Sequence, residues 1–184
     1  MTSARSACEV KSDGMLVEPG GSEKDWDVSC VTNMESMFEG ASAFNADLSD
    51  WDVSEVMDMN MMFYQAAAFD GDLSAWDVSE VMDMNRMFKY AAVFNGDLSA
   101  WDVSAVTNME WTFYRAEAFN GDLGAWDVSS VTTLERMFRG ATAFDGPHDW
   151  CVLDTVDIRD MFRSSACGSA AACGLTVVAD LADC

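Results

Sequence analysis

Residues 76–100 read WDVSEVMDMNRMFKYAAVFNGDLSA, and this 25-residue stretch decides the fold because it recurs along the chain. The tetrapeptide WDVS begins at five evenly spaced positions, namely Trp26, Trp51, Trp76, Trp101 and Trp126. A degenerate sixth copy begins one residue early, at Trp150. A unit of this length cannot bury its own apolar stripe, so the copies must stack on one another to form a core.

The apolar positions within one copy change their spacing. Around Leu48, Trp51 and Val53 the apolar residues begin to alternate with polar ones, which is typical of a short strand. Further along the copy, five apolar residues are spaced 3, 1, 3 and 3 apart, which is typical of one face of a short helix; they are Met59, Met62, Phe63, Ala66 and Phe69. The sequence therefore predicts a short strand and a short helix in every copy.

The boundaries of these helices carry their own signals. Asp58 and Asp83 precede the helical spacing and are of a favoured N-cap type. Each copy then continues from its last Phe into a dipeptide such as Asp70-Gly71 or Asn95-Gly96. These dipeptides tolerate the positive φ that a helix end or a tight turn needs. We therefore expect the glycines to adopt positive φ.

Composition and charge exclude several classes of function. The chain has 184 residues, half of them apolar, with 10 Lys and Arg against 32 Asp and Glu, a formal charge of −22. A chain of this length can bury a core, whereas binding to nucleic acid needs clustered cations. No apolar run is long enough to be inserted into a membrane. Since His148 is the only histidine, we expect no enzyme activity, cofactor or dedicated metal site.

The start of the repeat, L-x-x-W-x-V, resembles the strand half of a leucine-rich repeat. The whole unit, F-N-G-D-L-S-x-W-D-V-S-x-V-T-N-M-x-x-M-F-x-x-A, resembles the BspA-like leucine-rich-repeat surface proteins, in the branch with the mycoplasma-lipoprotein 25-residue repeat. The resemblance implies an α/β repeat solenoid, right-handed and leucine-rich-repeat-like. It also implies a secreted or cell-surface protein that acts in adhesion or protein binding, without catalysis.

Three segments follow from the repeat. Residues 1–25 form an N-terminal cap, residues 26–162 a solenoid of about six units, and residues 163–184 a cysteine-containing C-terminal cap. The first twenty residues contain no signal peptide, so an extracellular or cell-surface location requires a leader that this chain does not show.

Six cysteines lie near the two ends of the chain: Cys8, Cys30, Cys151, Cys167, Cys173 and Cys184. They are candidates for disulfides that staple the caps in an oxidising compartment, with reduced structural thiols as the alternative. Six cysteines allow fifteen pairings, among which the sequence does not choose. Cys184 is alternatively an unpaired thiol or an intermolecular link.

Two polar columns follow the predicted strands. One contains Asp52, Asp77, Asp102 and Asp127, with Asp27 at its start, and the other contains Ser54, Ser79, Ser104 and Ser129. Like charges on neighbouring strands repel one another, so the Asp column needs a reason. The Asp side chains close local turns by hydrogen bonds, bind Ca²⁺, or form a docking face for another protein with a basic patch.

Other residues break the repeat pattern. The cations Arg86, Lys89, Arg115, Arg136, Arg139, Arg159 and Arg163 all fall in the predicted helical halves, which predicts a polarised molecule. Trp111 interrupts its column beside Tyr114, either as a binding hot spot or as a filler of the space left where Thr112 replaces Met. We therefore expect a non-enzymatic binding module that uses the acidic strand face, with a scaffolding subunit of a larger assembly as the alternative.

Overall fold

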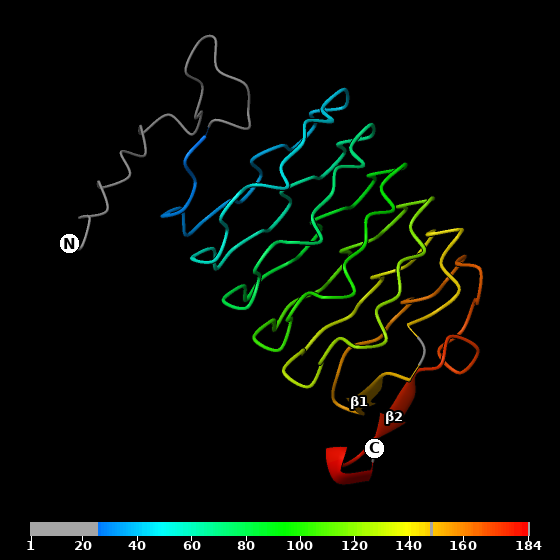
Figure 1. The fold of residues 1–184 in the computed structure, drawn as a ribbon. Helices are drawn as coiled ribbons and strands as arrows, with labels where there is room; N and C mark the ends of the chain where they lie inside the picture. Colours follow the sequence, from blue (N-terminus) through cyan, green and yellow to red (C-terminus); the bar gives the residue numbers. More distant parts are fainter. Residues whose placement is uncertain (1–25, 148, 184) are drawn as a thin grey trace, which may run out of the picture.

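The computed structural model describes residues 26–147 and 149–183. Each copy of the repeat makes one irregular coil, and the coils lie one behind the next from the blue to the orange end of the chain (Figure 1). Parallel bridges join the same position of successive copies. This bridged column, which fixes the register of the stack, contains Asn33, Asp58, Asp83, Asn108, Thr133 and Asp157.

Regular secondary structure among the described residues is confined to the C-terminal end. Strand β1 (Cys151–Leu153) pairs in parallel with β2 (Thr176–Val178), and a single 3₁₀ turn, η2 (Leu181–Asp183), follows. The predicted α/β solenoid with one strand and one helix per copy is therefore wrong. Only the last copy forms a strand at the W-x-V position, where residues 176–178 supply a partner.

The predicted helices are replaced by a chain of tight turns. In the second copy Met61 and Gln65 have φ values of 56° and 60°, in the left-handed region. The same two positions of all six copies have this conformation, which a right-handed helix cannot contain. The spacing of the apolar residues was compatible with both structures, because turns that close over three residues bury side chains at almost the same intervals as a helix.

Hydrogen bonding explains why these turns persist. The Met62 N–H donates within its own copy to the Met59 carbonyl at 3.2 Å, whereas the Met61 N–H donates to Asn85 of the next copy at 2.9 Å. The alternation continues, with the Phe63 N–H donating to the Met87 carbonyl. A helix would keep these donors inside one copy. The bonds between copies thus stabilise a backbone that costs about 1–2 kcal/mol per left-handed residue.

At the W-x-V corner the tryptophan side chain links neighbouring copies. The Trp76 Nε1–H donates at 3.0 Å to the carbonyl of Leu48, which lies three residues before Trp51 of the preceding copy. The Trp101 Nε1–H donates in the same way to the Leu73 carbonyl at 2.9 Å. Trp126 and Trp150 repeat this bond. Since a buried indole N–H requires an acceptor, this bond specifies Trp over another large apolar residue.

Three ladders of stacked rings run through the core. Trp76 and Trp101 lie 6.4 Å apart with an interplanar angle of 1°. The Phe residues of the Met-Phe column also stack, since the ring centres of Phe63 and Phe88 lie 5.5 Å apart. The third ladder contains Phe69, Phe94 and Phe119, which are fully buried. The core columns of the sequence are thereby confirmed as buried.

The expected positive φ holds for only one of the glycines after the last Phe. Gly146 has φ 131°, but Gly71, Gly96 and Gly121 do not have a positive φ. A Cβ at Gly71 would lie 2.8 Å from the ring of Phe69. Close packing against the Phe ring, rather than backbone conformation, therefore accounts for these glycines.

Two glycines at one left-handed position provide a test of the turn geometry. Gly40→Ala is expected to lower the free energy of unfolding by about 1–2 kcal/mol, because φ is 70° there and a new Cβ meets nothing within 4 Å. Gly140→Ala combines φ 77° with a Cβ placed 2.9 Å from the Arg115 side chain, so it should cost more. Urea unfolding of both variants measures the difference. No loss in either variant would contradict the left-handed turns.

The C-terminal segment folds back on the last copy through β2. Cys167 and Cys173 form a disulfide within this segment, and Cys30 and Cys151 are also disulfide-bonded. The prediction of disulfides is confirmed for these residues. Cys8, Cys184, His148 and the predicted N-terminal cap of residues 1–25 lie outside the described residues.

Candidate functional site

The Asp and Ser columns of the predicted strand face form one repeated turn. In the second copy the backbone N–H and the hydroxyl of Ser54 both donate to Oδ1 of Asp52, at 3.2 and 2.6 Å. The same pair of bonds joins Ser104 to Asp102, at 3.0 and 2.6 Å. The spacing D-x-S is what an Asx turn requires, so the hydrogen-bonded interpretation of the columns describes their local geometry.

These hydrogen bonds also fix the charge of the column. The serine bonds lower the pKa of Asp102 and Asp127, because they favour the ionised carboxylate. The carboxylate of Asp102 opposes this shift only slightly at Asp127. The exposed side chains therefore form an ordered array of negative charge. Within the described part of the chain, no group of three or more His, Cys, Asp or Glu residues is arranged to hold a metal ion.

A second acidic column lies at the preceding turn. Asp72 and Asp97 accept hydrogen bonds from the backbone N–H groups of Ser74 and Ser99, at 2.9 and 3.0 Å. These bonds lower the pKa of both carboxyl groups. Because it uses the same chemistry outside the predicted face, this column offers a matched control for experiments on Asp77 and its neighbours.

A shallow hollow lies beside the Asp77–Ser79 turn. An exposed methionine, Met57, contributes its apolar surface, and three acids, Glu55, Asp77 and Glu80, lie around it. Thr32, Ser54 and Ser79 complete the lining. Lysine and arginine side chains combine an apolar stem with a charged head. The hollow therefore has the two surfaces that such a side chain needs.

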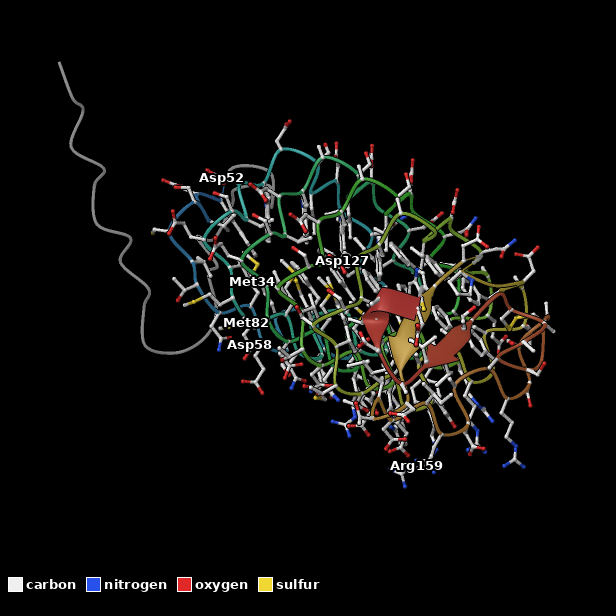
Figure 2. The ribbon with its side chains drawn as sticks, turned by 90° about the horizontal axis from the view of Figure 1, so that it is seen from below. Met34, Asp52, Asp58, Met82, Asp127 and Arg159 are labelled. Carbon is white, nitrogen blue, oxygen red and sulfur yellow. A yellow bond between two sulfur atoms is a disulfide. The ribbon has the colours of Figure 1, made fainter. Side chains whose placement is uncertain are left out.

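A different cluster gathers on the turns where helices were predicted. We call it the aromatic–cationic patch, and it contains Tyr64, Arg86, Lys89, Tyr90, Trp111, Tyr114 and Arg115. It includes every tyrosine of the chain. Figure 2 shows Arg159, which continues the cationic residues toward the C-terminus, at the opposite edge of the molecule from Asp52.

Lys89 lies at the centre of the patch and is only 8% exposed. Its Nζ lies 3.7 Å from the centre of the Trp111 ring and 5.2 Å from that of Tyr114. The rings of Tyr64 and Tyr90 are 5.6 and 5.5 Å away. Four aromatic rings from three successive copies therefore surround one ammonium group, a cation–π arrangement.

Charge around Lys89 is poorly balanced. Burial, followed by the nearby Arg86 guanidinium, lowers the pKa of Lys89 to about 8, although Glu110 acts in the opposite direction. The more C-terminal arginines are paired, since Arg139 contacts Asp160 at 2.7 Å and Arg159 contacts Glu135 at 2.6 Å. Among the described residues, by contrast, no carboxylate forms an ion pair with Arg86, Lys89 or Arg115.

The structure places Trp111 and Tyr114, the sequence-predicted hot spot, in this patch. Their rings stack with centres 5.0 Å apart, and the buried Nε1 of Trp111 has no hydrogen-bond partner. The neighbouring Thr112 is buried, and its hydroxyl, a single donor, lies within hydrogen-bond distance of the carbonyls of Met84 and Met109. Trp111 is therefore partly buried, with Lys89 over its ring and the buried Thr112 beside it in the chain.

Sequence reasoning missed Lys89 as a site residue. The sequence pattern placed Lys89 on a solvated helical face. Its contact with Tyr64 and Tyr114 depends on the stacking of three copies, which the sequence around Lys89 does not show. A signal was available nonetheless: Lys89 occupies the same column of the repeat as these two tyrosines, which lie one copy before it and one copy after it. Residues that depart from the repeat pattern in the same column of neighbouring copies were therefore the useful indicator of this site.

The stacked coils, the bridged register and the ring ladders define a tandem-repeat protein whose unit is one coil. The chain belongs to the family described as Mycoplasma protein of unknown function, DUF285, which matches residues 16–110 and again residues 72–171. No curated protein and no solved structure matches the chain. No helix in the described residues is long and apolar enough to cross a membrane.

Proposed function

We propose that this protein is a non-enzymatic recognition module that binds a basic protein partner through its acidic Asp–Ser face. The hollow beside Met57 carries the proposal, because it combines exposed apolar surface with surrounding carboxylates. Turn hydrogen bonds hold the Asp side chains of the same face in one orientation. Such ordered complementary charge speeds association and selects among partners.

The cell-surface setting is part of the same proposal. The family match is compatible with the BspA-like resemblance of the repeat and with a role in adhesion. Disulfides persist mainly in oxidising compartments, and the Cys167–Cys173 bond together with the bonded Cys30 and Cys151 supports an extracellular location. The partner would then meet the acidic face outside the cell.

Paired variants test the acidic face with a decalysine peptide as the probe. The double variant Asp77→Asn with Glu80→Gln should weaken binding by about tenfold, since it removes two carboxylates from the hollow while the introduced asparagine can still accept the Ser79 N–H. The control, Asp72→Asn with Asp97→Asn, makes the same change of net charge in the other acidic column. Isothermal titration calorimetry at 0.15 M salt gives both affinities.

Equal weakening in the two double variants would contradict the proposal, because the peptide would then respond only to net charge. No measurable effect of either pair would contradict it as well. Circular dichroism of each variant verifies that the fold is retained before the affinities are compared.

A scaffolding subunit is the second candidate, and one observation favours it. Met57 and Met82 occupy the same position of neighbouring copies and are 42% and 49% exposed. Their backbones are joined by a hydrogen bond of 2.9 Å from the Met82 N–H to the Met57 carbonyl. Two adjacent exposed methionines suit a permanent contact within a larger assembly.

A further inference from the structure

We infer that the aromatic–cationic patch is a second binding surface, separate from the acidic face, and that it receives an acidic segment of a protein partner. The inference does not depend on the proposed function, since it concerns different residues at another part of the surface. It rests on the burial of Lys89, on the unpaired cations around it and on the aromatic rings between them.

The first step concerns unmet polar groups. Lys89 is more than nine-tenths buried, yet its ammonium contacts rings and no described hydrogen-bond acceptor. The buried Nε1 of Trp111 also lacks an acceptor. A buried donor without an acceptor costs free energy, and in this patch the Nε1 of Trp111 is such a group. The ammonium nitrogen of Lys89 is not among the fully buried unpaired atoms, so a carboxylate, which only accepts hydrogen bonds, could pair with it directly.

The second step concerns charge. Arg86 donates one hydrogen bond to the neutral Asn85 side chain, at 2.8 Å, and its guanidinium lies 5.5 Å from the centre of the Trp111 ring. Arg115 is exposed and lies over Tyr114. Neither forms an ion pair within the described residues. Because guanidinium groups bind carboxylates through paired N–H donors, these two arginines define where the acidic side chains of the partner would lie.

The third step concerns the chemical class of the partner. Tryptophan, tyrosine and arginine are the residues that contribute most often to protein–protein hot spots, and all three meet in this patch. The net charge of −22 does not prevent the contact. At physiological ionic strength the screening length is about 8 Å, so carboxylates farther away than this act weakly here, whereas Glu110 is near enough to act on Lys89.

A titration with decaglutamate, followed by two-dimensional NMR of the full chain at 0.15 M salt, tests the inference. The expected result is saturable binding that shifts the indole N–H resonance of Trp111, which is assigned by its absence from Trp111→Phe. The double variant Arg86→Gln with Arg115→Gln should lower the affinity by about tenfold or more. Arg159→Gln with Arg163→Gln is the control, because these cations are already near carboxylates, and it should change the affinity by less than about twofold.

Three results would overturn the inference. The first is the absence of saturable binding up to millimolar peptide. The second is equal weakening by the two pairs of arginine variants. The third is tighter binding of a sulfated oligosaccharide or of single-stranded DNA at matched charge, which would assign the patch to another class of polyanion. Should the Arg86 and Arg115 variant fail to fold, the resonances shifted in the wild-type protein decide whether the peptide lies on the patch.

Discussion

Replacing Phe94 with alanine is expected to lower the free energy of unfolding by about 3–5 kcal/mol. Phe94 is fully buried, lies 5.9 Å from Phe69 and 6.0 Å from Phe119, and packs against Phe88 at 4.1 Å. Truncation removes both the apolar contact and the ring stacking in the middle of the stack. Since each copy contacts only its neighbours, a defect there weakens the junctions on both sides. Urea unfolding followed by circular dichroism measures the loss.

Phe44→Ala provides the matched control in the same column. Phe44 is only partly buried and belongs to the first copy, where it stacks on Phe38 at 4.1 Å and on Phe69 at 5.7 Å. Its loss should cost roughly half as much as that of Phe94, because a site near the end of a stack relaxes and rehydrates more easily. Equal costs at the two positions would contradict a continuous ring ladder.

The register of this stack was predictable from the sequence. A column that must bury the same surface in each copy keeps the same residue type. The recurrence of Phe63 as Phe88, and of Trp76 as Trp101, one copy later therefore predicts that these side chains contact each other. The D-x-S spacing likewise indicated the hydrogen bond from Ser54 to Asp52. Both inferences use short-range geometry or strict repetition, which a single sequence displays.

The backbone between those columns was not predictable. The left-handed conformation of Met61 and Gln65 has no residue signature, because neither residue prefers it. It exists only because bonds to the next copy, such as that from Met61 to Asn85, are made in the assembled stack. Gly40 and Gly140, at the position equivalent to Gln65, were the only hint that a helix was unsuitable.

The same reason explains the patch. The lowered pKa of Lys89 results from its burial among rings and cations that three copies contribute. That burial depends on the stacking of the copies and not on the residues next to Lys89 in the sequence. Sequence placed Trp111 and Tyr114 at a candidate hot spot, and the shared repeat column of Tyr64, Lys89 and Tyr114 was the one signal that joined them to Tyr64. Contacts between copies thus determine both the backbone and the most unusual side chain of this protein.

Replacing Lys89 with methionine should remove a rise in stability that the wild-type protein shows as the pH increases above about 8. Burial lowers the pKa of Lys89 from 10.5 to about 8 in the folded state. Between these two values the unfolded chain binds the proton and the folded chain does not, so the wild type becomes more stable with increasing pH. The shift sets an upper limit of about 3 kcal/mol on this rise in stability. The rise should be smaller than the limit, because the surrounding rings attract the charged form and offset part of its desolvation. Urea unfolding from pH 7 to pH 10 measures the difference.

Arg86→Gln distinguishes this cause from a general alkaline effect. The Arg86 charge is the second largest contribution to the low pKa of Lys89, with Arg136 acting in the same sense and Glu110 against them. Removing Arg86 should raise that pKa and move the rise in stability to higher pH, while Lys89→Met abolishes it. Tyr64, Tyr90 and Tyr114 also face Lys89 and themselves titrate at alkaline pH. The contribution of the lysine is therefore measured as the difference in the free energy of unfolding between the wild type and the variant at each pH. Parallel curves for the wild type and Lys89→Met would show that the lysine is no more buried in solution than an ordinary surface cation.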